Sequence, residues 1–538
     1  MEAYSFFVIG VSILIAGGSV AGYGAAVARV LRIPRPGLGD LVVLGALTAG
    51  ALVTVVHFAA PIRGGVQAAI LAGGAVCAWV RRDIWKAAVW SLEGLYFLAA
   101  AAFLVHCAAA APRASYDTGL YHMQAVRWIQ EAATTPGLAN IHGRLAFNSL
   151  YYKLAALFYI PALGWKSAFS MTPVLAAAGL AGLYAWIARA SEAEDGRLSP
   201  PAVLAVLATL TLGTVGSLLC LDLSALANDP LVAIVILLLT VQAWAALRNP
   251  GSEAAPQMMV ATATFAVLVK LSAVFVAAPM VLATAWRIPG SVWRSRAAVG
   301  MGLLAGGLAC LNAAVLSGCL AYPVGATCLT ELPWAVTDAT AAKEARMIEW
   351  WAKWGPADHA PQDWSWISPW WGNHRQDALV DVCGWLLIGA AVVAGLGLLT
   401  GRRLRAGAAW LLGGALAFGS AAWFVTAPDP RFGVGNVLGL CLFLAAVAVA
   451  PWLSGWSPKS LQFLLPLGFL AALPFVPEPR LEDWGTPPMV ELEPIGHSEL
   501  GTIHRPVGGD QCWAAPIPCV PEPLSEKAIE LFSVSPLP

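Results

Sequence analysis

Apolar runs of about 20 residues recur along the whole chain and constrain its fold more than any other feature. A run of that length crosses a bilayer as a helix, whereas a barrel strand needs about 10 residues of alternating polarity. Backbone groups inside such a run must bond within their own segment, and only a helix allows this. Of the 538 residues, 59% are hydrophobic and 12% are charged, against about 25% charged in a soluble domain. The sequence therefore predicts an all-α polytopic membrane protein.

About 12–14 transmembrane helices are expected. The first run is too long and too poorly flanked for a cleaved signal peptide, so we expect it to remain as a helix. The eighth and ninth runs are short for a bilayer and also fit one broken hairpin. The fourteen candidate runs are 4–28, 40–60, 64–80, 88–111, 168–189, 201–220, 229–247, 257–270, 272–286, 298–318, 378–400, 407–426, 433–452 and 460–475.

Basic residues divide unevenly between the two sides of the predicted bundle. Of the 31 Lys and Arg, sixteen lie in short turns on one side and three in short turns on the other, and twelve lie in long segments, which are exempt from the positive-inside rule. The first side is therefore predicted to be cytoplasmic. We expect a bacterial inner-membrane protein whose N-terminus, long segments and C-terminal tail are periplasmic. The net charge of zero gives no sign of a nucleic-acid partner.

Long connections divide the chain into parts. The Pro-rich tail is expected to form an ordered outer cap, although its composition also fits disorder. The parts are an N-terminal four-span segment 1–111, a first large outer loop 112–167, central spans 168–318, a Trp-rich outer loop 319–377, C-terminal spans 378–475 and the outer tail 476–538.

Four of the ten cysteines form close pairs in outward segments. An oxidising compartment favours the disulfides Cys319–Cys328 and Cys512–Cys519. A metal site is the alternative, although no histidine stands at finger-like spacing. The other six cysteines lie within spans and are expected to act as small apolar residues.

Unusual polar residues collect at the outer ends of the predicted helices. Ionisable groups within a bilayer usually face a cavity or a partner. This layer therefore suggests a site that binds an anionic lipid headgroup and moves a proton. Each residue also has an ordinary structural reading: Asp117 and Asp229 as helix N-caps, Lys270 as a snorkelling side chain, Arg431 as an ion-pair partner and His122 as a buried polar group.

Tryptophans crowd the outer loop 319–377. A belt at the membrane interface accounts for part of this enrichment. The remainder fits a stacking platform for a sugar or an isoprenoid tail, with Trp364, Trp366, Trp370 and Trp371 as its candidates.

The order of these motifs resembles the GT-C superfamily of polytopic glycosyltransferases. The matching features are Asp117 in a large outer loop, a D-P-L span start at Asp229, Lys270 at an outer turn and Arg431 in an outer P-R-F. More narrowly, "YDTGLYHMQAVRWI", "HGRLAFNSLYY", "SGCLAYP", "APDPRFG" and "QCWAAPIPC" resemble a group of bacterial multi-pass membrane proteins with a GT-C-like plan. Two features depart from the superfamily: the large outer loop follows the fourth span rather than the first, and Thr118 stands where many members carry a second acid.

The resemblance implies transfer of a sugar from a polyprenyl-phosphate-linked donor to a glycan, lipid or protein acceptor. Asp117 would be the general base, Lys270 and Arg431 would bind the donor phosphate, and His122, Asn148, Asp229 and Tyr322 would position the substrate. No cofactor is certain, and a divalent metal is possible. The alternatives are a flippase or transporter of a lipid-linked saccharide, and a polysaccharide polymerase or ligase. The absence of detectable repeats counts against a transporter.

Overall fold

The computed structural model describes residues 2–110, 115–192, 197–215, 222–353, 363–402 and 407–535, and most of them are helical. Within these residues, nine helices are long and apolar enough to cross a membrane, which indicates a multi-pass membrane protein. They are Phe7–Val30, Leu38–His57, Leu92–Ala110, Trp165–Arg189, Asp229–Arg248, Arg296–Ser317, Ala378–Leu399, Gly407–Thr426 and Pro430–Leu453.

The remaining predicted runs form shorter or bent helices. The run at 64–80 becomes α4 (Gly64–Val80), which meets α5 (Arg82–Val89) at 87° as a broken span or re-entrant pair. Three apolar helices, Pro200–Leu212, Ala254–Val269 and Leu271–Arg287, are shorter than a full span. The run at 460–475 becomes α23 (Pro458–Ala472), which contains Pro466. The expected 12–14 full spans are not all found within the described residues. The predicted run 201–220 lies partly outside them, and other apolar runs end early at Pro, at Lys270 or at a sharp turn.

Close backbone approach joins the N-terminal helices α2 (Gly18–Val30) and α3 (Leu38–His57). A Cβ on Gly24 would lie 1.8 Å from the Leu41 carbonyl oxygen, and one on Gly45 would lie 1.8 Å from that of Val20. Small residues allow such packing in membranes, where lipid contact offers apolar groups the same environment as another helix. These glycines set the distance between the two helices.

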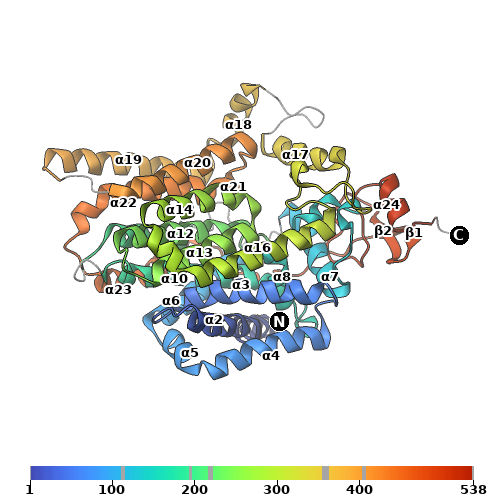
Figure 1. Ribbon diagram of the computed structural model, residues 1–538, viewed down its shortest axis with the longest axis horizontal. Helices are drawn as coiled ribbons and strands as arrows, with labels where there is room; N and C mark the ends of the chain where they lie inside the picture. Colours follow the sequence, from blue (N-terminus) through green and yellow to red (C-terminus); the bar gives the residue numbers. More distant parts are fainter. Residues whose placement is uncertain are drawn as a thin grey trace.

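The core of the bundle is α12 (Asp229–Arg248), which is buried almost throughout and contacts α10 (Met171–Arg189), α13 (Ala254–Val269) and α14 (Val274–Arg287). By contrast, α19 (Ala378–Leu399) is exposed along most of its length. Exposed apolar side chains on such a helix suit contact with lipid. The late helix α22 (Gly439–Leu453) packs against α19, and α20 (Trp410–Thr426) packs against α14 and α22 (Figure 1).

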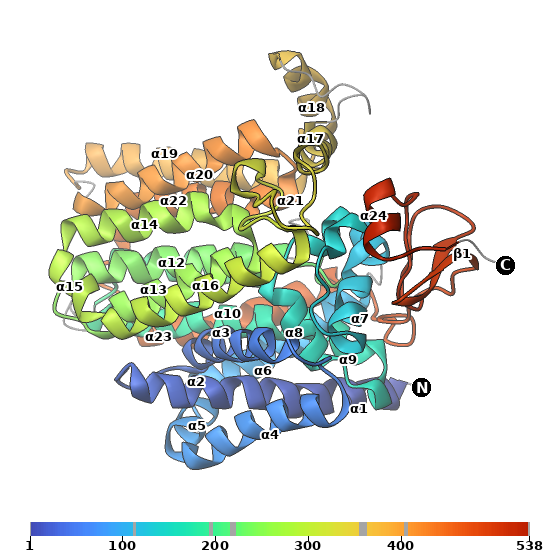
Figure 2. The same cartoon turned by 45° about the vertical axis from the view of Figure 1, so that its right-hand side comes forward.

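The long connections gather at one end of the bundle (Figures 1 and 2). There lie α7 (Met123–Glu131), α8 (Leu150–Phe158), α17 (Asp338–Lys353) and the C-terminal tail, whereas α15 (Pro289–Arg294) lies at the opposite end. One or two short helices are predicted for the Trp-rich loop, and its described part contains α17 and α18 (Ile367–His374).

The tail is ordered over its described residues and contains strands that the sequence did not predict. Strands β1 (Leu492–Ser498) and β2 (Gly501–Pro506) form an antiparallel hairpin with an irregular register between Pro494 and Gly496, and α24 (Glu526–Leu531) follows. Cys512 and Cys519 are disulfide-bonded beside it, and Cys319 is bonded to Cys328.

Candidate functional site

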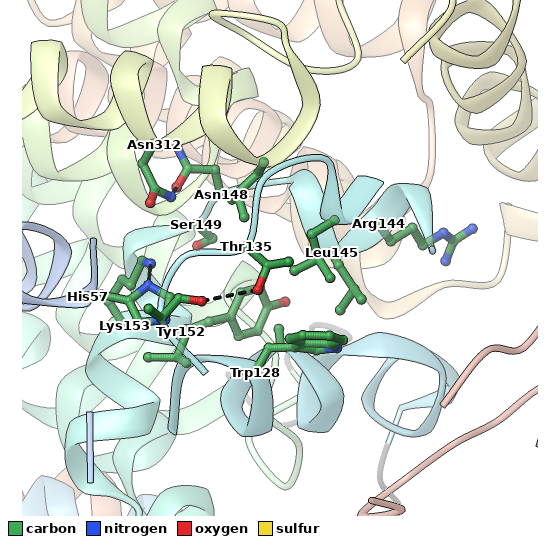
Figure 3. Close-up of a pocket in the computed structure, with 15 residues that line it drawn as sticks. His57, Trp128, Thr135, Arg144, Leu145, Asn148, Ser149, Tyr152, Lys153 and Asn312 are labelled. Atoms are coloured by element: carbon green, nitrogen blue, oxygen red, sulfur yellow. Dashed lines mark hydrogen bonds between the residues drawn. The ribbon is translucent and has the colours of Figure 1, made fainter. Parts of the chain in front are cut away.

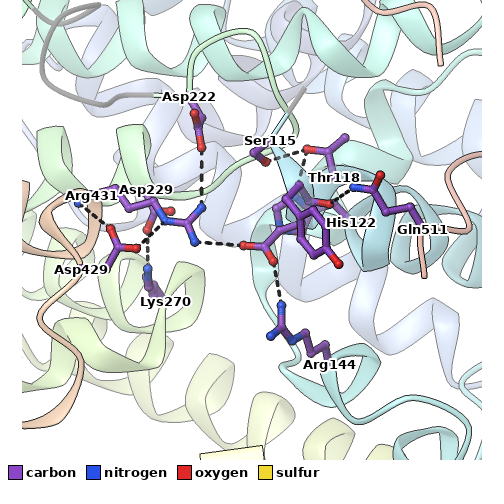
Figure 4. Close-up of polar contacts among 12 residues, drawn as sticks. Ser115, Thr118, His122, Arg144, Asp222, Asp229, Lys270, Asp429, Arg431 and Gln511 are labelled. Carbon is purple, nitrogen blue, oxygen red and sulfur yellow. Dashed lines mark hydrogen bonds and ion pairs between the residues drawn. The ribbon is translucent and has the colours of Figure 1, made fainter. Parts of the chain in front are cut away.

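Asp117 lies at the start of a π-helical turn, Thr118–His122, that leads into α7. Its side chain makes no capping hydrogen bond. Instead Oδ1 accepts a hydrogen bond from Arg144 Nη1 at 2.7 Å and Oδ2 accepts one from Arg431 Nη2 at 3.3 Å (Figure 4). Asp117 is therefore a member of an ion-pair network rather than a helix cap.

The charge of Asp117 depends on this network. Burial opposes ionisation of the carboxyl, but neighbouring cations outweigh burial and hold its pKa below the usual value. Burial lowers the pKa of His122 to about 4, so His122 is uncharged at neutral pH. His122 is charged only in the acidic range in which Asp117 itself titrates, and there it is the largest of the neighbouring cations. At neutral pH the guanidinium groups of Arg431 and Arg144 are charged neighbours of the carboxylate.

Arg431 stands among three carboxylates. It lies in α21 (Pro430–Gly433), where Asp429 caps the helix by accepting from the Arg431 backbone N–H at 3.0 Å. Its guanidinium is 3.3 Å from Asp117, 3.3 Å from Asp429 and 3.9 Å from Asp222. Segments more than 300 residues apart thus meet at one cation.

Lys270 joins the same region from the end of α13. Its Nζ donates to Asp229 Oδ1 and lies 3.7 Å from the centroid of the Phe432 ring. Asp229 is the first residue of α12, and its side chain makes this ion pair while Asn228 holds the N-cap position. The three residues first expected to do chemistry, Asp117, Lys270 and Arg431, are therefore brought together.

Arg144, Asp222 and Glu344 complete the network. Asp222 belongs to the layer of polar residues expected at the outer helix ends but had no assigned role, and Arg144 and Glu344 were not selected from the sequence. Arg144 Nε lies 3.5 Å from Glu344 Oε1 on α17, so Arg144 bridges two acids. Burial raises the pKa of Asp222 to about 6, with Arg431 opposing the rise. The arginine stands inside the quoted motif "HGRLAFNSLYY", and the charge within that apolar run was the available signal.

Tyr322 and Asn148 take different positions. Tyr322 is buried beside Glu344 and its hydroxyl has no hydrogen-bond partner among the described residues. Asn148 is not in the network: its Nδ2 donates to the Ala309 carbonyl at 2.7 Å and its Oδ1 accepts from Asn312.

The predicted tryptophan platform is divided. Trp364 and Trp371 are exposed, whereas Trp366 and Trp370 are buried against Phe424 and so do not present a free stacking face. Trp370 Nε1 donates to the Pro428 carbonyl at 2.7 Å, next to Asp429. The buried tryptophans therefore support the segment that carries Arg431.

The disulfide-closed loop of the tail covers the π-helical turn. The Trp513 backbone N–H donates to the Gly119 carbonyl at 2.8 Å, and a Cβ on Gly119 would lie 2.5 Å from the Trp513 ring. Gln124 Nε2 donates to the carbonyls of Trp513 and Ala515 at 3.0 and 2.9 Å. The tail thus holds the helix that presents Asp117 and His122.

In the described part of the chain, no group of three or more His, Cys, Asp or Glu side chains is arranged to hold a metal ion. The carboxylates of Asp117, Asp222 and Asp429 face the Arg431 guanidinium, which already supplies the positive charge at their centre.

Comparison with known proteins identifies a family but no function. No curated protein and no solved structure matches the chain. The model of one family, described as Domain of unknown function (DUF8201), matches residues 6–438, a range that contains Asp117, Arg144, Asp222, Lys270 and Arg431. Because this match spans most of its length, the chain belongs to the DUF8201 family.

Proposed function

We propose that this protein is a membrane glycosyltransferase that moves a sugar from a polyprenyl-phosphate-linked donor to an acceptor at the periplasmic face of the bacterial inner membrane. The observation that supports it is the convergence of one ionised carboxylate, Asp117, with Arg431 and Lys270 at the end of the bundle where the long connections gather. The resemblance of the sequence motifs to the GT-C superfamily indicates the donor class.

In this proposal Asp117 accepts the proton of the acceptor hydroxyl as its oxygen attacks the anomeric carbon. The bond from that carbon to the donor phosphate breaks, the configuration inverts, and polyprenyl phosphate leaves. General base catalysis typically contributes 10²–10⁴-fold. Arg431 and Lys270 stabilise the charge that develops on the leaving phosphate.

Donor binding requires the cations to exchange partners. Asp117, Asp222, Asp229, Asp429 and Glu344 outnumber the three cations of the network. A phosphate adds further negative charge, so it must displace a carboxylate from Arg431 or Lys270. Burial raises the pKa of Asp222 to about 6, so this carboxyl group can be protonated slightly below neutral pH, and its protonation would release one side of Arg431. We assign no step to a metal ion.

The test is turnover of a polyprenyl-phosphate-linked sugar by purified protein in proteoliposomes. Asp117→Asn should lower turnover by about 10²-fold or more, while Asp338→Asn, which changes an exposed acid at the start of α17, should not. Release of free polyprenyl phosphate identifies a transferase, and release of the pyrophosphate identifies a polymerase or ligase. Movement of an intact donor across the bilayer would identify a transporter and overturn the proposal.

A further inference from the structure

A second buried cation lies outside the ion-pair network. Lys153 is on α8, and its side chain is almost fully buried. Its Nζ lies 2.9 Å from His57 Nδ1, at the end of α3. The other ring nitrogen of His57 lies 3.1 Å from the Ala132 carbonyl oxygen, so it donates there and leaves Nδ1 as an acceptor. The neutral His57 ring accepts a hydrogen bond from one ammonium hydrogen of Lys153 but does not neutralise its positive charge.

No acid compensates this lysine. Among the described residues, no carboxylate lies within 4.0 Å of Lys153 Nζ, and His57 Nδ1 is its one hydrogen-bond partner. Burial alone lowers the pKa of Lys153, to about 7. A buried unpaired charge is costly, so a protonated lysine needs either a counter-charge or solvent beside it.

A cavity of about 40 Å³ adjoins Lys153 and His57 and extends toward Trp128 and Arg144 (Figure 3). Its titratable lining groups are Lys153 and Tyr152 from α8, His57 from α3, and Arg144, and no acidic side chain lines it. Trp128 from α7 is buried, and its Nε1–H has no partner among the described residues. Asn148 and Asn312 supply further polar groups. The lining is thus rich in donors and cations.

We propose that this cavity binds a small monovalent inorganic anion of halide size, held against the Lys153 ammonium. The volume argues for this class, because a single water requires about 10–15 Å³ on this measure. There is room for one monatomic anion with a water or two. The inference does not depend on the proposed transferase activity. The anion is held by Lys153, which is not a member of the ion-pair network, although Arg144 of that network also lines the cavity.

The experiment uses chloride and bromide as probes on the full-length protein in detergent. Replacing gluconate with chloride at constant ionic strength should raise the Tm by about 2 °C or more at saturation, because a ligand bound to the folded state stabilises it. Lys153→Met, which keeps the length of the side chain without its charge, should abolish the rise. Lys166→Met changes the lysine on α9 (Trp165–Phe169), which bonds Ser5 and the tail, and should retain it.

A second measurement uses only the wild-type protein, so it does not depend on whether the variants fold. Crystals of the wild-type protein grown with bromide should show anomalous density within hydrogen-bond distance of Lys153 Nζ. A wild-type protein with no chloride response, an equal response in Lys153→Met, or bromide bound elsewhere would each overturn the proposal. Glycosyl transfer is not measured here, so a failed transferase test leaves this outcome unaffected.

Discussion

The ion-pair network around Arg431 and the cavity beside Lys153 both bury cations at the same end of the bundle, but they neutralise them differently. Arg431 has three carboxylates within 4.0 Å, and Arg144 has two. Lys153 has a neutral imidazole. A lysine, unlike an arginine, loses its proton readily when buried.

A buried cation paired with carboxylates and a buried cation without them respond differently to an incoming anion. In the network, carboxylates neutralise the cations and hold them in place, so an incoming anion must compete with the carboxylates. In the cavity, the charge of Lys153 depends on pH and on what occupies the adjoining space. The first arrangement suits a reaction site, and the second suits a site that an ion fills.

The largest effect is expected from breaking the network. Arg431→Ala should lower donor turnover by about 10²–10³-fold, the usual effect of removing one charge-stabilising donor. It should also cost about 3 kcal/mol of stability, at the low end for a broken buried pair because the side chain is 29% exposed. Arg431→Lys should recover stability more than turnover. Unchanged turnover in Arg431→Ala would show that the network is structural only.

Lys153→Met should change how the stability of the protein depends on pH. The folded-state pKa of Lys153 is about 7 and the unfolded value is about 10.4, so the unfolded chain binds more protons between these values. Wild-type stability in halide-free buffer should therefore rise between pH 7 and 9, by up to about 2 kcal/mol. Lys153→Met should lack this rise. The test is the denaturation midpoint of both proteins measured between pH 7 and 9. The same pH dependence in wild type and Lys153→Met would contradict the prediction.

Asn312→Asp should place a carboxylate in the cavity, so that its cation is neutralised by an acid as the cations of the network are. Asn312 lines the same cavity as Lys153, and a carboxylate there would supply the missing counter-charge. The chloride-dependent rise in Tm should disappear because the added acid competes with the anion. Asn312→Ala removes the same hydrogen bonds without adding charge and should keep the rise. If both variants respond to chloride like the wild type, the acid-free lining is not what selects an anion.

Asp222→Asn should have the smallest effect. The pKa of Asp222 is about 6 in the folded state and about 3.9 unfolded, so the folded chain binds more protons between these values and wild-type stability falls as pH rises from about 4 to 6. The full shift corresponds to about 3 kcal/mol, which solvent screening reduces because the side chain is 31% exposed. Removing the charge should therefore stabilise the protein by about 1 kcal/mol at pH 7 and by nothing below pH 4. A loss of stability that is equal at pH 5 and pH 8 would show that Asp222 is an ordinary ion-pair partner.

Local patterns were enough to predict the helices and the candidate triad. Continuous apolar runs specify helices in a membrane, and charges at helix ends identify Asp117, Lys270 and Arg431 without knowledge of their neighbours. Close spacing likewise predicted the pairs Cys319–Cys328 and Cys512–Cys519, which are disulfide-bonded.

Partners distant along the chain could not be predicted in this way. Arg144 is a member of the network because it pairs with Asp117 on one side and with Glu344 of α17 on the other. Asp222 is a member because a loop places it near Arg431. The spans that proved short or bent could not be distinguished by hydropathy, which measures composition and not where a helix turns.

Local composition is sufficient to specify a helical membrane protein with unusual charges at helix ends, because in lipid each apolar segment must form its own backbone hydrogen bonds. The pairing of those charges follows from the packing of distant segments. Arg431 has its acids and Lys153 has none because long-range packing, and not local composition, sets what lies beside a buried side chain.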